Sequence, residues 1–226
     1  MIVNEIFYSL QGEGFLAGMP GVFVRLAGCP LRCRWCDTKY AWPPSAGREL
    51  SPEQIKEQIN SYPTRHIVIT GGEPMTNPEL KELMETLAGK ERHITIETSG
   101  IKYIPDLPCD LMSISPKLSN STPAEPALAA EHEKLRFDGQ ALQKLIDSFN
   151  YQLKFVVDAP VDLDQIAVCL KKLENVNPDK VFLMPQATTP GELLAKSRML
   201  APVCRRTGFA LSQRLQVLLW NNEKGR

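Results

Sequence analysis

The residues best suited to chemistry are three cysteines that fall within eight residues of one another. Cys29, Cys33 and Cys36 have the spacing C-x₃-C-x₂-C and follow a short apolar stretch. Thiolates three and four residues apart on a compact loop can converge on one soft-metal centre. In a reducing compartment such a group indicates metal or redox chemistry rather than disulfide bonds.

Three kinds of metal site compete for this loop. A structural zinc site needs four protein ligands, but the next cysteine is Cys109 and the nearest histidine is His66, so no fourth ligand lies nearby in sequence. A bacterial ferredoxin has the run C-x₂-C-x₂-C-x₃-C-P, which does not match. The third is a [4Fe–4S] cluster held by three cysteines, with one iron left open as a catalytic metal site requires.

The cysteine spacing resembles the signature of the radical S-adenosylmethionine (SAM) superfamily. Trp35 precedes the last cysteine, and the sequence TGGEP at residues 70–74 resembles the superfamily's glycine-rich motif, where glycines let the backbone approach a ligand. In that superfamily the open iron binds the amino and carboxylate groups of SAM. An electron from the cluster cleaves SAM to a 5′-deoxyadenosyl radical, which removes a hydrogen from the substrate. The resemblance therefore implies a [4Fe–4S] cluster and SAM as cofactors.

The flanking motifs resemble the 7-carboxy-7-deazaguanine synthase family of the queuosine (7-deazapurine) pathway over nearly the full chain. The matching motifs are SLQGEG at 9–14, FVRL at 23–26, DT at 37–38, ETSG at 97–100, SPK at 115–117 and MPQ at 184–186. The resemblance implies a radical-mediated ring contraction of 6-carboxy-5,6,7,8-tetrahydropterin to 7-carboxy-7-deazaguanine. Ammonia is released, SAM is used catalytically, and Mg²⁺ is a further cofactor.

The resemblance also implies roles for single residues. The cluster ligands are Cys29, Cys33 and Cys36. The cofactor-binding residues around the cluster and SAM are Trp35, Cys36, Asp37, Gly72, Ser115, Pro116, Lys117, Pro185 and Gln186. The residues that bind the substrate are Leu10, Gln11, Gly12, Arg25 and Thr70. Thr38 matches the family's magnesium ligand.

The chemistry of several of these side chains suits the roles. Arg25 is a permanently charged planar fork inside an apolar strand, which suits the carboxylate of the substrate. Gln11 offers both a donor and an acceptor to a pterin, and the Thr38 hydroxyl is a hard oxygen of the kind that Mg²⁺ accepts. Glu97 faces the same rim, either toward the site or as a buried partner for Lys117 or Arg25, and the sequence does not decide between these.

Short apolar stretches bounded by turn residues predict the strands that position these groups. They are residues 21–28, 66–70, 93–98, 110–115, 152–158 and 180–184. Helical patterns lie between them, so the chain predicts βαβ units and a mostly parallel sheet. Six strands are too few for a closed eight-stranded barrel. An open, partial βα barrel or a doubly wound sheet fits better, and the family resemblance implies the partial barrel, with ligands at the C-terminal strand ends.

The helices are expected from capping and periodicity. Ser51-Pro52 and Asn77-Pro78 each open a helical pattern, and further helices are expected over 139–149, 163–173 and 190–207. Residues 119–134 are expected to form a surface loop or partly helical insertion within a single domain, residues 1–226. The apolar tail 214–220 is expected to be a final strand or an interface segment. The isolated cysteines are expected to be small buried hydrophobic residues: Cys109, Cys169 and Cys204.

Composition bounds the remaining possibilities. The 226 residues are 43% hydrophobic, and 26 Lys and Arg balance 26 Asp and Glu. A net charge of zero argues against a protein that grips nucleic acid through its phosphates. No apolar run approaches the roughly 18 residues of a membrane span, and the N-terminus does not read as a secretory signal. We expect a cytoplasmic enzyme, and the family implies a homodimer and an electron donor such as flavodoxin or ferredoxin.

Two other functions remain open at this stage. A radical SAM activase of a glycyl-radical enzyme has a similar N-terminal flank, but it needs a large docking surface for a protein. A non-enzymatic Fe–S electron carrier belongs to a different class and needs a fully ligated cluster. Reductive SAM cleavage excludes the carrier, and turnover of the pterin excludes the activase.

Overall fold

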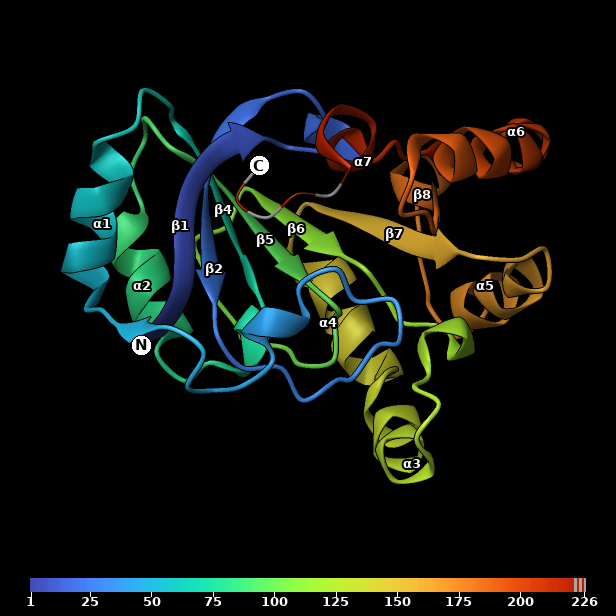
Figure 1. Cartoon of the computed structure of the whole chain (residues 1–226), viewed down its shortest axis with the longest axis horizontal. Coiled ribbons are helices and arrows are strands. Elements are labelled where there is room, and N and C mark those ends of the chain that lie inside the picture. The colour runs from blue at the N-terminus through green and yellow to red at the C-terminus, as the bar shows by residue number, and fades with distance from the viewer. Residues whose placement is uncertain (222, 224, 226) are drawn as a thin grey trace.

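The computed structural model describes residues 1–221, 223 and 225, which are arranged around one open, nine-stranded sheet (Figure 1). The strand order is β3-β1-β2-β4-β5-β6-β7-β8-β9. Neighbours from β2 to β9 are parallel, whereas β1 pairs antiparallel with both β2 and β3. The strands are β1 Ile2–Leu10, β2 Pro20–Leu26, β3 Arg48–Glu49, β4 His66–Gly71, β5 His93–Thr98, β6 Leu111–Ile114, β7 Tyr151–Val157, β8 Val181–Pro185 and β9 Ala210–Leu211.

All six predicted strands are present, as β2 and β4 to β8. Their apolar residues are buried on both faces; β6, β7 and β8 have no exposed residue. Such burial is typical of parallel strands that are covered by helices. Three further strands, β1, β3 and β9, were not expected, because β1 mixes polar and apolar residues and the other two are only two residues long. The prediction of an open α/β sheet is thus confirmed.

The helices connect the parallel strands. They are α1 Pro52–Asn60, α2 Leu80–Leu87, α3 Pro126–Leu135, α4 Gly139–Ser148, α5 Asp162–Leu170, α6 Pro190–Thr207 and α7 Leu215–Trp220. The Ser51 side chain and Gln54 form a capping box at the start of α1, which satisfies otherwise unpaired amide groups. In α2 the buried residues recur at helical spacing: Leu80, Leu83, Met84 and Leu87.

One stretch differs from expectation, and the expected partly helical insertion is present. The tail at 214–220 is neither a strand nor part of the sheet; it is the short helix α7, whose start is held by the Leu215 amide donating to Gly12 O at 3.0 Å. Five of the six residues of α7 are apolar, and so short an apolar run does not distinguish strand from helix. Within 119–134, residues from Pro126 onward form α3.

The arrangement places loops from distant parts of the chain at one edge of the sheet. Parallel strands β2, β4, β5, β6, β7 and β8 end at this edge, where open α/β sheets bind ligands. In Figure 1, α1 and α2 lie on one side of the molecule, and α7 lies beside the β1–β2 connection. Among the described residues, no helix is both long enough and apolar enough to cross a membrane.

Candidate active site

A cavity of about 300 Å³ opens at the C-terminal ends of the parallel strands. The predicted site residues that line it are Leu10, Gln11, Gly12, Arg25, Cys29, Cys33, Trp35, Cys36, Asp37, Thr38, Thr70, Gly72, Ser115, Lys117 and Gln186. Pro116 and Pro185 do not line it; both are buried beside residues that do. The structure therefore gathers residues that are spread over nearly 180 positions of the chain.

The cluster loop, residues 28–38, leaves β2 and carries the three cysteines along one wall of the cavity. All three are free thiols, and Cys33 is only 6% exposed. Burial raises the pKa of Cys29 to about 12, with the Glu73 charge adding to the effect, and burial raises the pKa of Cys33 to about 11. Iron binds thiolates, so a cluster must displace protons from this loop as it forms.

The donor set of this wall fits a [4Fe–4S] cluster. Besides the three thiols, no cysteine or histidine lines the cavity in the part of the chain that the structure describes. Three thiolates per cubane leave one iron for an external ligand. Residues 1–221, 223 and 225 hold no group of three Cys, His, Asp or Glu side chains already gathered at ligand distance.

The glycine-rich turn after β4 packs directly against the start of the cluster loop. The Gly72 amide donates to Leu26 O at 2.9 Å, and the Glu73 amide donates to Gly28 O at 2.9 Å. A Cβ atom at position 72 would lie 2.0 Å from Gly28 O, closer than real Cβ contacts come. Only glycine fits this position, so the two motifs form one packed unit.

Glu73 fixes the turn to the end of β5 and is 3% exposed. Its carboxylate accepts hydrogen bonds from Met75 N at 3.1 Å, Thr98 Oγ1 at 2.6 Å and Ser99 N at 2.7 Å. A buried carboxylate satisfied by several donors is a rigid anchor. The acid of the GGEP motif is thus a structural part of this wall.

The residues expected to bind SAM lie around Trp35. Lys117 Nζ lies 5.5 Å from the centroid of the Trp35 ring and donates to Ser115 Oγ at 2.9 Å. Gln186 follows β8, and its amide donates to Val157 O at 2.8 Å. Together these residues offer the cation of Lys117, the hydroxyl of Ser115 and the side-chain amide of Gln186 to the cavity.

Arg25 occupies the middle of the cavity floor, on β2 between Glu5 of β1 and Thr70 of β4. Its Nε donates to Glu5 Oε1 at 2.7 Å, and Tyr40 OH donates to the same oxygen at 2.9 Å. Burial, with the Glu5 acceptor adding to it, raises the pKa of Tyr40 and keeps its phenol protonated. Because Glu5 engages Nε, the Nη groups are the part of the guanidinium that can meet a ligand's carboxylate.

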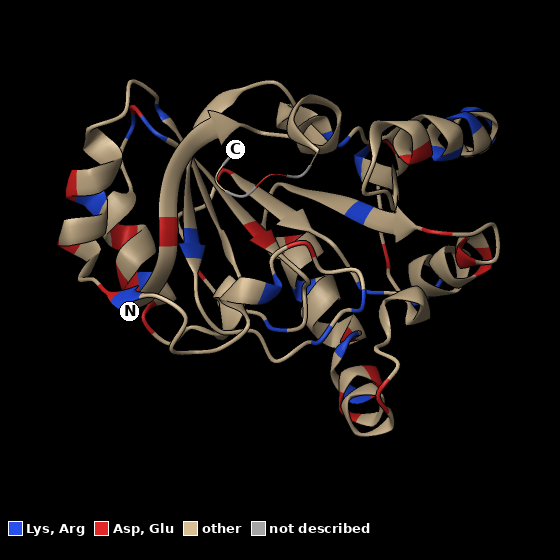
Figure 2. Ribbon diagram, viewed as in Figure 1, with Lys and Arg blue, Asp and Glu red and all other residues tan. Residues whose placement is uncertain are grey.

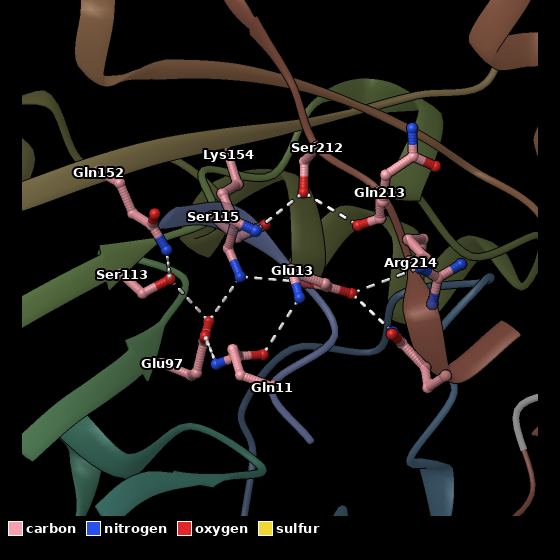
Figure 3. A network of polar contacts seen from close by, with 12 residues as sticks. Gln11, Glu13, Glu97, Ser113, Ser115, Gln152, Lys154, Ser212, Gln213 and Arg214 are labelled. Carbon is pink, nitrogen blue, oxygen red and sulfur yellow. Dashed lines mark hydrogen bonds and ion pairs between the residues drawn. The ribbon is translucent and has the colours of Figure 1, made fainter. Parts of the chain in front are cut away.

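A buried lysine joins two carboxylates on the opposite wall (Figure 3). Lys154 of β7 is 1% exposed, and its Nζ donates to Glu13 Oε2 at 2.9 Å and to Glu97 Oε2 at 2.8 Å. Gln11 Nε2 donates to the other oxygen of Glu97 at 3.1 Å, and Ser113 Oγ donates to Glu97 Oε2 at 2.9 Å. The network thus connects the β1–β2 loop with β5, β6 and β7.

Glu13 and Lys154 of this network favour each other's charged form. Burial alone raises the pKa of Glu13, but Lys154 and Arg214 lower it to about 2. Burial alone lowers the pKa of Lys154, but Glu97 and Glu13 outweigh it and raise the pKa above its usual range. Glu13 therefore stays ionised in the cavity wall, where its carboxylate can accept hydrogen bonds from a ligand.

Arg214, just before α7, ties the C-terminal part of the chain to both walls. Its Nε lies 3.4 Å from Glu13 Oε1, its Nη1 donates to Ala187 O at 2.6 Å, and its Nη2 donates to Asp37 Oδ2 at 3.1 Å. Gln216 Nε2 also donates to Glu13 Oε1, at 2.8 Å. The apolar tail of the sequence therefore brings polar groups to the cavity.

Charged side chains on the strands are few, and they mark the site. Figure 2 shows the strands almost free of acidic and basic residues. Outside the two-residue β3, the strands carry only Glu5, Arg25, Glu97 and Lys154, which form one ion pair on each side of the site. A charge on a buried strand is costly unless it is paired.

Sequence reasoning missed part of this wall. Lys154, Glu13 and Arg214 were not singled out, and Glu97 pairs with Lys154 rather than with Lys117 or Arg25. A signal was present, because Lys154 is the one charged residue in the apolar run of β7, just as Arg25 is in β2. Glu13 and Arg214 lie in loops, where a charge is ordinary.

Thr38 lies at the end of the cluster loop, facing the cavity. Its Oγ1 is 3.6 Å from Cys36 Sγ. A single hydroxyl is compatible with Mg²⁺, which commonly takes few protein ligands and completes its octahedron with water and substrate.

The chain was compared with known proteins. Residues 24–117 match the model of the radical SAM superfamily. The chain is 40% identical to a 7-carboxy-7-deazaguanine synthase of Halobacterium salinarum, in an alignment covering 97% of this chain and 90% of that protein. It is 37% identical to a protein of the same name from Rhodopirellula baltica, covering 100% and 88% of the two chains.

A solved structure shows the same architecture. The crystal structure of QueE from Escherichia coli superposes with a TM-score of 0.72 at 27% sequence identity, covering 93% of this chain and 92% of that one. A structure of TYW1 with a bound lysine–pyruvate adduct has a TM-score of 0.53 at 14% identity and shares only the fold.

Proposed function

The chain belongs to the 7-carboxy-7-deazaguanine synthase family of radical SAM enzymes, and from this premise we propose that its cavity converts 6-carboxy-5,6,7,8-tetrahydropterin to 7-carboxy-7-deazaguanine. As a radical SAM enzyme it uses a [4Fe–4S] cluster and SAM, acts on a small molecule and needs a reductant. The observation that carries the proposal is one cavity that joins three free thiols to an arginine and to two partly buried carboxylates held by one lysine.

The cofactors supply one-electron chemistry: when bound, the cluster and SAM provide a radical that removes a hydrogen atom from the substrate. The thiols of Cys29, Cys33 and Cys36 hold the cluster. Trp35, Gly72, Ser115, Lys117 and Gln186 bind SAM beside it, with Asp37, Pro116 and Pro185 shaping the same wall. This assignment is supported by the shared cavity and by the packing of Gly72 against the start of the cluster loop.

The opposite wall binds the pterin in this proposal. The Nη groups of Arg25 bind the substrate carboxylate, and Thr70 lies beside Arg25 in register. Gln11, with Leu10 and Gly12 of the same loop, contacts the ring. Glu13 and Glu97 accept hydrogen bonds from its amino and ring N–H groups. Lys154 holds both carboxylates in place before substrate arrives.

The overall change explains why SAM need not be consumed. Substrate and product differ by one molecule of ammonia, so no oxidant or reductant is used up across the whole reaction. A hydrogen that is removed early can therefore be returned later. We propose that Thr38 binds Mg²⁺, with substrate and water as the other ligands, because its hydroxyl faces the cavity beside Cys36.

The proposal extends to the organisation, partners and location of the protein. We propose a single domain, supported by one sheet that contains strands from Ile2 to Leu211. A homodimer is supported by the exposed Leu218 and Leu219 on α7. Flavodoxin or ferredoxin is proposed as the reductant because the family resemblance implies such a donor. A cytoplasmic location is supported by six free cysteines, because oxidising compartments favour disulfides. The net charge of zero gives no support for a nucleic-acid partner.

Anaerobic turnover tests the proposal. The reconstituted protein is mixed with dithionite, SAM, Mg²⁺ and 6-carboxytetrahydropterin, and products are followed by mass spectrometry. We expect 7-carboxy-7-deazaguanine in many-fold excess over 5′-deoxyadenosine, since SAM is regenerated. SAM cleavage without the deazapurine would overturn the substrate assignment and revive the activase, which no comparison favours. Omission of Mg²⁺ tests the role of Thr38, and a Thr38→Ala variant should then respond less to added Mg²⁺.

A further inference from the structure

The segment between β6 and α4 contacts the cluster loop from outside the cavity. The α3 segment, residues 118–136, contributes no residue to the cavity lining among the described residues. It nevertheless makes hydrogen bonds to the cluster loop and to Lys117. Its contacts therefore act on the position of cofactor-binding groups rather than on a ligand.

Both amide groups that flank Cys33 donate to this segment. The Arg32 amide donates to Nδ1 of His132 at 3.3 Å, and the Arg34 amide donates to Ser121 O at 2.8 Å. The residue between them is the middle cysteine of the three. His132 thus holds the backbone before Cys33, and Ser121 holds the backbone after it.

The two acceptors are themselves joined. His132 Nε2 and Ser121 Oγ are 2.9 Å apart, and Ser121 Oγ donates to Leu118 O at 2.6 Å. His132 is 1% exposed and Ser121 is 0% exposed. Because the serine proton goes to Leu118, His132 Nε2 must carry the hydrogen, which leaves Nδ1 as the acceptor that the Arg32 amide requires.

The surroundings favour the neutral ring. Burial lowers the pKa of His132; Glu133 opposes this, whereas Arg136 and Lys117 add to it. Arg136 also donates from Nη1 to Lys117 O at 3.0 Å, so the end of α3 holds the SPK turn as well.

We propose that His132 is a positioning residue that, through Ser121, fixes the backbone around Cys33 so that the loop presents its thiols for cluster binding. The inference rests on the proposed function only in taking the three cysteines as cluster ligands. Residues that orient a ligand from behind commonly change metal affinity 10- to 100-fold when they are removed. The α3 segment is therefore part of the machinery of cluster retention.

The first test uses the cluster-free wild-type protein, which needs no variant to fold. Hydrogen exchange followed by NMR should show the amides of Arg32 and Arg34 protected at least about tenfold relative to unstructured peptides. Exchange at the unstructured rate at both amides would overturn the proposal, because the two hydrogen bonds would then not persist.

The second test compares variants after anaerobic reconstitution, by the rate at which iron is released to a chelator. His132→Ala should release iron about tenfold faster than wild type. His132→Asn places an amide oxygen near the Nδ1 position and should restore most of the retention. Glu131→Ala, an exposed neighbour on α3, is the matched control and should match wild type. Thermal unfolding of each cluster-free protein separates cluster loss from unfolding.

The outcomes divide clearly. Fast release in His132→Ala that His132→Asn repairs supports the proposal; equal rates in all four proteins overturn it. If His132→Ala does not fold, His132→Asn alone is compared with wild type. Release of iron from a folded His132→Asn protein as fast as from a free peptide also overturns the proposal. If wild type makes the deazapurine and the variants release iron at the wild-type rate, the proposed function stands and only this inference is removed. If iron retention depends on His132 but wild type makes no deazapurine, this inference stands and the proposed function is removed.

Discussion

The two walls of the cavity differ in what holds their polar groups before a ligand binds. On the wall of strands β5 and β7, Lys154 already bridges Glu13 and Glu97, and Lys154 and Glu13 favour each other's charged form. On the cluster-loop wall, the thiols of Cys29 and Cys33 are protonated, and burial holds their pKa values far above neutrality. One wall is preorganised for its ligand, and the other is completed by its ligand.

This difference suits the ligand that each wall binds in the proposed function. A neutral pterin ring brings N–H donors that need fixed acceptors, and fixed charges on rigid strands discriminate well. A metal cluster forms strong bonds to sulfur that can draw thiols together and displace their protons. The loop wall therefore needs only a backbone held in roughly the right place, which its packing on Gly72 and its bonds to the α3 segment supply.

The largest effect should follow from removing a thiol. Cys33→Ala leaves two ligands for a cluster that needs three, so reductive SAM cleavage should fall at least about 1000-fold. Iron content and cleavage are measured together after reconstitution. Cys109→Ala, at a half-buried site that hydrogen-bonds to Ile94 O, is the control and should retain its cluster. Equal iron in both variants would contradict the assignment of this wall.

The preorganised wall should respond in stability as well as in binding. Lys154→Met leaves two carboxylates without their shared cation, and breaking a buried pair costs about 3–5 kcal/mol. Urea unfolding of the cluster-free protein measures this loss, with the exposed Lys171→Met as the control expected to change within about 0.5 kcal/mol. A loss as small as that of the control would mean that the lysine is not needed before substrate binds.

Acid should weaken the same wall with a defined sign. The folded pKa of Glu13, about 2, lies below its ordinary value of 4.5, so its ionisation stabilises the fold above pH 4.5 and loses this effect as pH falls toward 2. Wild type should exceed Glu13→Gln by about 3 kcal/mol at pH 7 and by about half of that at pH 3. Unfolding free energies at a series of pH values test this, and a pH-independent gap would contradict the low pKa.

The smallest effect belongs to an ion pair on the open side of the cluster loop. Arg34 Nη2 lies 2.8 Å from Asp158 Oδ2, but the arginine side chain is 55% exposed. Arg34→Ala should therefore lower the unfolding free energy of the cluster-free protein by less than about 1 kcal/mol. A loss comparable to that of Lys154→Met would show that the two walls are not held differently after all.

How much was predictable follows from how local each signal is. The six core strands and the cysteine loop each depend on a short, continuous stretch of residues. The sequence therefore predicted them, and with them the open sheet. Arg25 was singled out because it interrupts an apolar strand; Lys154 does the same in β7 and was overlooked. Applying one argument to both strands would have found it.

Other parts were not predictable in the same way. Glu13 and Lys154 are 141 positions apart, and pairing over that distance depends on the fold. In α3 only His132 is fully buried, so its sequence has no apolar stripe that would indicate the bounds of a helix. The six residues of α7 have no clear periodicity, so the tail was expected to be a final strand or an interface segment and its helix was missed.

The packing of Gly72 on Gly28 has a consequence for anyone who wishes to transplant this chemistry. The start of the cysteine loop at Gly28 is shaped by Gly72, in a turn that follows a different strand 44 positions later in the chain. Grafting the eight-residue cysteine stretch alone onto another scaffold would leave its first ligand without the surface that supports it. The smallest transferable unit is two adjacent parallel strands with both of their loops.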